Sequence, residues 1–225
     1  MQFENTQVFG VENALYGMRL PLNLSLAEVK GKSDSESDHI GAIDLSLAQK
    51  LINADKSYNS QPNSKFLRMI HVQVCITAPA YWFAEADTYK VGTVRNSSSL
   101  QHKGMAKDYT LDDFAIDNVE NIKADIATNK LELIASHYWK HLLEYLNGLR
   151  KLYLETKDYS YFRALRQAMP MSYLYTSMFD TNYAVLRTII GQRKHHKLSE
   201  WHEFIDWCNS LPYAKELLLG VFNEK

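Results

Sequence analysis

Residues 66–103 read FLRMIHVQVCITAPAYWFAEADTYKVGTVRNSSSLQHK, and this stretch decides the fold. Its first part alternates apolar residues with mixed ones, namely Ile70, Val72, Val74 and Ile76 against His71, Gln73, Cys75 and Thr77. This period of two predicts a strand with one face in a core. The strand is expected to end at Ala78-Pro79, because proline cannot donate to a ladder and suits the first turn of a helix.

A short helix is predicted after this strand, because Tyr81, Glu85 and Tyr89 fall on one helical face. Gly92 and the polar run Asn96–Ser99 predict that the helix ends in a loop rich in hydrogen-bond donors. A strand that leads into a helix and then a Ser/Asn/Arg loop is one way to bind an anion. Many strand–helix corners bind nothing, so the residue chemistry alone leaves open whether this corner is an anion site.

This stretch resembles the flavin-dependent thymidylate synthases, a family that methylates dUMP without a catalytic cysteine. In that family a strand ending in Ala-Pro leads to a helix with the signature R-H-R-x-x-S-x-N-x-x-S-x-R-Y, which holds the flavin and the nucleotide. Laid without gaps on residues 88–101, the signature keeps a positive charge at Lys90, a hydroxyl at Thr93 and its second serine at Ser98. The family's Arg, His, Asn, Arg and Tyr are replaced by Thr88, Tyr89, Arg95, Leu100 and Gln101.

A second block of the chain carries the same resemblance. Residues 166–176, RQAMPMSYLYT, are similar to the family's A-R-x-x-L-P-x-x-x-Y-T segment, which supplies an arginine that contacts the nucleotide. Arg166 stands four residues before Pro170, as in the family. The resemblance therefore covers residues 66–210, with its motifs in the family's order.

Residues 182–193 are similar to the family's N-x-R-x-L…R helix. Asn182, Leu186 and Arg193 match that pattern, and His196 is a candidate match for the histidine that follows it. From the residues alone, the basic run 193–197 is more typical of a solvated helix junction than of a phosphate pocket, and the resemblance favours the pocket for Arg193.

The resemblance implies a nucleotide site and a flavin site built from separate blocks of the chain. It assigns nucleotide binding to Glu85, Ser97, Ser98, Ser99, Arg166 and Arg193. It assigns flavin binding to Ser64, Lys90, Thr93, Arg95, Asn182 and His196. Arginine suits such a role because its planar fork can bind a phosphate or a uracil edge through two parallel donors. No side chain is assigned to catalysis and none to a metal.

The fold implied by the resemblance is α+β, with residues 1–225 forming one domain, an antiparallel sheet and several long helices, assembled as a homotetramer. The implied activity is C5 methylation or hydroxymethylation of a uracil deoxynucleotide in a phage or bacterial enzyme. FAD is the expected cofactor, with methylenetetrahydrofolate and NADPH as co-substrates. Because a cofactor carries the difficult chemistry, such an enzyme tolerates substitutions in its sequence motifs.

Two other functional classes stay open. Losing the arginines at Thr88 and Leu100 removes charge-assisted hydrogen bonds worth roughly 1.5–3 kcal/mol each. A flavin-free protein that binds or sequesters a nucleotide on the same fold is therefore an alternative. A purely structural or interaction role on that fold is another.

Composition excludes several classes of function. The chain has 25 basic and 26 acidic residues. Its net charge of −1 therefore lacks the excess of positive charge that is typical of general nucleic-acid binding. Cys75 and Cys208 are the two cysteines, and we expect both to be reduced, buried and inert. No stretch approaches the ~18 apolar residues of a membrane span, and no secretion signal is recognisable. A cytoplasmic protein without membrane contact is expected.

Periodicity predicts the remaining elements. Apolar residues recurring at three and four predict a long helix over residues 130–155, and further helices over residues 158–169 and 198–208. Residues 7–18 are predicted to open with a short strand, followed by an extended connector at 20–22. Asp44 is expected to cap the helix that follows it.

His137 and His141 lie four residues apart in the long helix, so a metal pair is conceivable. No H-E-x-x-H pattern and no third ligand accompany them, which favours a place on the helix surface.

Overall fold

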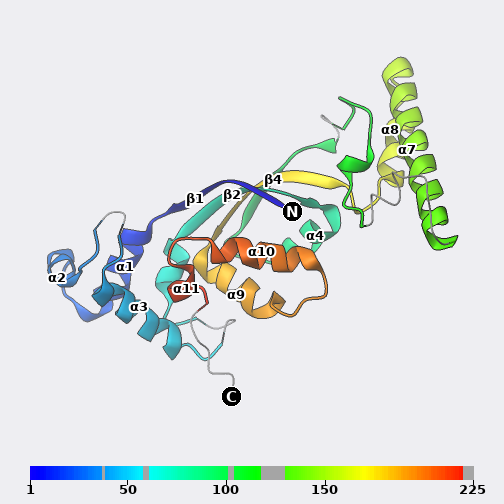
Figure 1. Ribbon diagram of the computed structural model, residues 1–225. Coiled ribbons are helices and arrows are strands. Elements are labelled where there is room, and N and C mark those ends of the chain that lie inside the picture. Colours follow the sequence, from blue (N-terminus) through cyan, green and yellow to red (C-terminus); the bar gives the residue numbers. More distant parts are fainter. Residues whose placement is uncertain (37–38, 58–60, 101–103, 118–129, 220–225) are drawn as a thin grey trace. The chain divides into compact units, whose positions relative to one another are not determined.

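The computed structural model describes residues 1–36, 39–57, 61–100, 104–117 and 130–219, except for the side chains of 130–134. It is an α+β protein with a four-stranded antiparallel sheet in the order β1-β2-β4-β3 (Figure 1). The strands are β1 (Gln2–Phe9), β2 (His71–Pro79), β3 (Val94–Ser97) and β4 (Leu174–Asn182). The expected α+β class with an antiparallel sheet is confirmed, while the homotetramer stays a prediction.

The chain forms two compact units. The first contains Met1–Ile76, Asp87–Asn96 and Ser177–Lys225, and the second contains Thr77–Ala86 and Ser97–Thr176. The strands β2 and β4 carry the chain from one unit into the other. The expectation of a single domain stays a prediction.

The first unit packs helices on the sheet. Figure 1 shows α9, α10 and α11 gathered along the sheet, with α1, α2 and α3 together at its end. Inward side chains of β2 and two aromatic side chains of α10 are fully buried: Val72, Val74, Ile76, Trp201 and Phe204. The helical elements of this unit are α1 (Val11–Arg19), η1 (Leu20–Leu22), α2 (Leu26–Lys32), α3 (Ala42–Ala54), η2 (Lys65–Met69), α9 (Tyr183–Arg193), α10 (Ser199–Asn209) and α11 (Ala214–Leu217).

The second unit contains the long helix. Its helical elements are α4 (Ala80–Ala86), η3 (Leu111–Asp113), α7 (Lys130–Thr156) and α8 (Tyr159–Ala168). The helices α7 and α8 pack together around a buried cluster that includes Leu146, Leu149 and Phe162. The side chain of Asp158 caps α8 by accepting a hydrogen bond from the Ser160 N–H at 2.9 Å, as the sequence suggests. Both predicted helices are confirmed.

The helix after β2 is shorter than the sequence predicts, so the prediction that it includes Tyr89 is wrong. α4 ends at Ala86, and residues 94–97 form the strand β3 instead of a loop. Pairing with β4 stabilises this strand: Thr93 and Thr181 exchange a hydroxyl hydrogen bond of 3.1 Å, and the Ser98 N–H donates to the Thr176 carbonyl at 2.8 Å. Tertiary pairing therefore overrides the local preference of a Ser/Asn run for a loop.

The N-terminal prediction also needs correction. The strand β1 ends at Phe9, and residues 11–19 form the helix α1, with Leu15 buried on its inner face. Gly10, at φ 81°, makes the left-handed turn between them. Residues 20–22 form a 3₁₀ turn and not an extended connector.

Asp44 is not a helix cap. The helix α3 begins after Gly41, and the carboxylate of Asp34 accepts its first N–H groups, from Ile43 at 2.8 Å and Asp44 at 3.0 Å. The Asp44 side chain is fully buried and pairs with Arg19. Asp44 therefore forms a buried ion pair in the core of the first unit.

None of the helices in the described part of the chain is both long and apolar enough to cross a lipid bilayer. His137 and His141 both lie on the exposed side of α7, where the His141 ring contacts Glu144 at 3.2 Å. Cys208 is buried, and burial raises the pKa of its thiol. Cys75 is only partly buried, so the expectation of two buried cysteines is wrong for this residue.

Candidate nucleotide site

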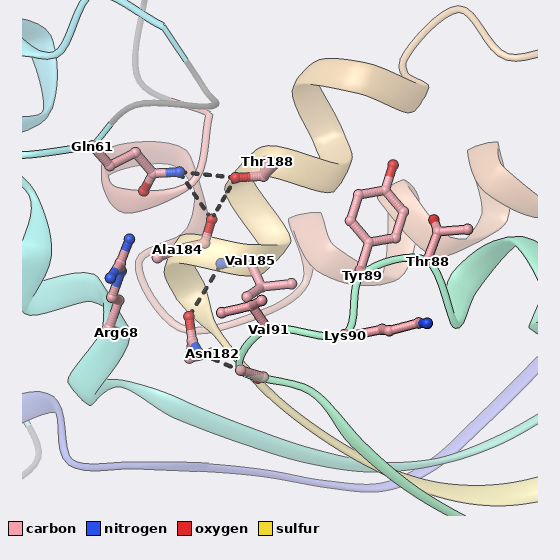
Figure 2. A pocket seen from close by; sticks show the side chains of 11 residues that line it. Gln61, Arg68, Thr88, Tyr89, Lys90, Val91, Asn182, Ala184, Val185 and Thr188 are labelled. Carbon is pink, nitrogen blue, oxygen red and sulfur yellow. Dashed lines mark hydrogen bonds between the residues drawn. The ribbon is translucent and has the colours of Figure 1, made fainter.

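A pocket of about 450 Å³ lies in the first unit (Figure 2). Three segments form it: the turn after α4, the start of α9, and the chain around η2. The lining residues are Gln61, Arg68, Thr88, Tyr89, Lys90, Val91, Gly92, Asn182, Ala184, Val185 and Thr188. This volume falls within the range of ~300–1,000 Å³ for small-molecule sites.

Asn182 joins the turn to the helix. Its side-chain oxygen caps α9 by accepting from the Val185 N–H at 3.1 Å, and its amide nitrogen donates to the Gly92 carbonyl at 3.3 Å. Gly92 has φ 82°, and a Cβ there would lie 2.7 Å from the Asn182 amide nitrogen. The close approach therefore requires glycine.

Gln61 forms the opposite wall. Its amide nitrogen donates to the Ala184 carbonyl and to the Thr188 hydroxyl, both at 3.0 Å (Figure 2). No motif of the sequence contains Gln61. It lies in a polar connection, and only its contact with α9 reveals its place.

The charge of the pocket is positive. Arg68 and Lys90 line it, and its lining contains no Asp or Glu. Figure 2 shows Arg68 on the side of Gln61 and Lys90 extending away on the other side. Both side chains belong to exposed residues. Of the predicted flavin residues, Lys90 and Asn182 thus meet in one pocket, whereas Arg68 was missed because no motif contains it.

Two predicted flavin residues make contacts on the sheet instead. The guanidinium of Arg95 forms a two-pronged ion pair with Asp87, at 2.9 and 2.6 Å. The Thr93 hydroxyl pairs with Thr181 of β4. Neither side chain is among those that line the pocket.

The other two predicted flavin residues also lie outside the lining. Ser64 is completely buried, and its hydroxyl donates to Asp55, whose carboxylate also accepts from Asn63. The His196 Nδ1 accepts a hydrogen bond from the Leu198 N–H at 3.2 Å. These contacts stabilise local chain geometry.

Arg193 is enclosed by aromatic rings. Its guanidinium carbon lies 4.7 Å from the centre of the Trp201 ring and 5.7 Å from that of Tyr89. Such cation–π contacts favour a fixed orientation of the side chain. Arg193 therefore has a packing role in the first unit, in addition to any role toward a nucleotide.

The remaining predicted nucleotide residues, Glu85, Ser97–Ser99 and Arg166, belong to the second unit, with Ser97 at the end of β3. Arg166 is exposed on α8. The N–H of Ser98 donates to the carbonyl of Thr176, so it is not free to bind an anion.

Leu100 explains one departure from the signature. This residue stands where the family has an arginine, and here it is 4% exposed in the apolar cluster of the second unit. A Cβ on Gly104 would lie 2.5 Å from its Cδ1 atom. An arginine in this position would bury its charge, and so leucine suits the core.

The comparison with solved structures confirms the fold. The flavin-dependent thymidylate synthase ThyX from Helicobacter pylori, complexed with FAD and dUMP, matches with a TM-score of 0.65 and 16% identity over 99% of this chain and 100% of that chain. A second structure of thymidylate synthase X from the same organism with FAD and dUMP gives a TM-score of 0.64 and 16% identity over 97% of each chain. No family model matches the chain, and no curated protein matches its sequence. The chain thus shares the fold of these synthases at low identity.

Proposed function

We propose that the protein is a flavin-dependent enzyme of the thymidylate synthase type. In the proposed reaction, the C5 hydrogen of a uracil deoxynucleotide is replaced by a one-carbon unit from methylenetetrahydrofolate. The observation that supports this most is the match over the full chain to structures that hold FAD and dUMP. The meeting of Lys90 and Asn182, both assigned to flavin by the resemblance, in one positive pocket adds to it.

The lining of the pocket fits part of a flavin nucleotide. Lys90 and Arg68 offer positive charge to a phosphate, and Val91, Val185 and the Tyr89 ring offer apolar surface to a flat ring. When bound, reduced flavin would supply the hydride that completes the methyl group, with NADPH as the reductant.

The protein's own groups have the tasks of binding and orientation in this proposal. Asn182 holds the turn 88–92 against α9, which fixes the backbone from which Lys90 extends. Such rigid support is what a site needs to keep a ligand in a productive geometry.

A titration with FAD tests this proposal. We expect FAD to bind, with quenching of flavin fluorescence and a rise in melting temperature, and dUMP to bind to the flavin-loaded protein. Replacing Lys90 by Ala should weaken FAD binding at least tenfold, because a charge-assisted contact contributes about 1.5–3 kcal/mol. Lys50→Ala, an exposed lysine on α3, is the matched control and should bind like the wild type.

A flavin-free nucleotide-binding protein is the second candidate. The observation that favours it is Leu100, whose place in the apolar core removes a charged donor of the family signature. Binding of dUMP without any binding of FAD would support this candidate against the enzyme.

The assembly proposed with this function is a homotetramer in which more than one chain builds each site. Closed symmetric assemblies are the usual outcome for such enzymes. Light scattering at micromolar concentration should give about four times the chain mass of 26.0 kDa. A stable monomer would count against this assembly.

A further inference from the structure

Arg68 differs from other arginines of the first unit in its surroundings. Arg19 is neutralised by Asp44, and Arg95 by Asp87. In the part of the chain that the structure describes, Arg68 has no ion pair, although it lines the pocket. A cation that faces a pocket without a carboxylate in its lining favours an anionic ligand there.

The start of α9 offers little to an anion, although it borders the pocket. The Tyr183 N–H donates to the Ile70 carbonyl at 3.0 Å, and the Val185 N–H donates to the Asn182 side chain at 3.1 Å. These first-turn N–H groups are therefore already used by the protein, and side chains must make the contact with an anion.

The backbone under Arg68 is firmly placed. Its neighbours Phe66 and Leu67 in η2 are buried, and the Ile70 N–H closes the turn on the Leu67 carbonyl at 3.4 Å. η2 also packs against α1, where a Cβ on Gly10 would lie 2.5 Å from the Met69 carbonyl oxygen. The guanidinium thus extends from a rigid turn, which favours a defined binding geometry.

We infer that Arg68 is the main phosphate-binding residue of this pocket, and that Lys90, whose side chain extends away from Arg68, adds only general positive charge. The ligand class is a nucleoside phosphate, and this part of the inference rests on the proposed function. Arg68 is suited to the contact because its planar fork can donate two parallel hydrogen bonds to one phosphate, whereas the lysine acts as a point charge. The pocket volume of about 450 Å³ suits one nucleotide-sized group.

Calorimetry with ADP as the probe, and adenosine as the uncharged comparison, tests this inference. Arg68→Ala and Arg68→Gln should each weaken ADP binding roughly ten- to hundredfold and leave adenosine binding unchanged. Arg68→Lys should lose less, because the charge remains. Arg163→Ala, an exposed arginine on α8, is the control and should bind ADP like the wild type.

A rescue variant provides a second test of this inference. Thr88 lines the same pocket, so Thr88→Arg in the Arg68→Ala background should restore part of the ADP affinity. The inference is overturned if wild type does not bind ADP, or if Arg68→Ala and Arg68→Gln bind it as tightly as wild type does. If ADP binds through Arg68 while FAD and dUMP do not bind, the proposed function fails and the inference stands.

Discussion

The Nε of Arg193 donates a hydrogen bond of 3.0 Å to the hydroxyl of Tyr89. The same hydroxyl donates to the Gln192 side chain at 2.9 Å, and the ring of Tyr89 packs edge-on against Trp201. Tyr89 stands where the family signature has a histidine and also lines the pocket. This tyrosine therefore links the pocket wall to the end of α9.

Removing the hydroxyl of Tyr89 should destabilise the protein. Tyr89→Phe leaves the ring but removes the group that bonds both Arg193 and Gln192, so we expect the free energy of unfolding to fall by about 1 kcal/mol. Urea denaturation measures this difference. Tyr138→Phe, an exposed tyrosine of α7, is the control and should change nothing. Equal stabilities of the Tyr89 variant and wild type would show that the bond is not formed in solution.

The pair of Arg19 and Asp44 should be essential for the first unit. Asp44 is fully buried and also accepts a hydrogen bond from the Ser35 hydroxyl at 2.6 Å. Asp44→Ala leaves the Arg19 charge buried without its partner, which costs about 3–5 kcal/mol. Removing both charges in Arg19→Met/Asp44→Leu should cost less than the single change. Thermal and urea denaturation measure the stabilities of the single and double variants. A double variant less stable than Asp44→Ala would contradict this expectation.

A methyl group at Gly92 should disturb the pocket. Gly92→Ala forces a side chain into a left-handed conformation and against the Asn182 amide, so we expect about 1–3 kcal/mol of destabilisation and weaker FAD binding. Gly31→Ala is the control, because a Cβ there meets no atom within 4 Å. Since Gly31 lies within α2, alanine should slightly stabilise that helix. Equal stability and equal FAD binding of the two variants would contradict the requirement for glycine at residue 92.

The Asp34 carboxylate should make stability depend on pH in the acidic range. The N–H of Ile43 lowers the pKa of Asp34, so the unfolded chain takes up a proton before the folded one does. The stabilisation is present above the unfolded pKa of about 4 and is lost as the pH falls through the lower folded pKa. Asp34→Asn should have a lower melting temperature than wild type at pH 7, and the gap should close toward about pH 2. A gap that does not change with pH would contradict this assignment.

Local patterns predicted one central strand and the long helices. The alternation from Ile70 to Ile76 directly encodes the face of β2 that is buried. The neighbouring strand β4 was missed, although Ser177, Phe179 and Thr181 alternate in the same way and are buried. Its strand character depends on pairing with β2, a contact between segments distant in sequence that no local pattern reveals.

The pocket was only partly predictable, for a similar reason. Lys90 and Asn182 belong to motifs, so their chemistry was visible in the sequence. Gln61 and Arg68 lie in a connection and a 3₁₀ turn without periodicity, and only the packing of that turn places them. Asp44 was predicted to cap a helix because aspartate is favoured at that position. Its side chain instead forms a buried ion pair with Arg19.

The release of tritium from dUMP labelled at C5 measures the proposed activity itself, because methylation and hydroxymethylation both remove this hydrogen. With FAD, NADPH and methylenetetrahydrofolate present, we expect wild type and Lys50→Ala to release tritium to water at equal rates. Lys90→Ala should release it at least tenfold more slowly at a fixed, limiting FAD concentration. No release by wild-type protein in the complete mixture, under conditions where dUMP binds, would contradict the proposed enzyme and leave a nucleotide-binding protein.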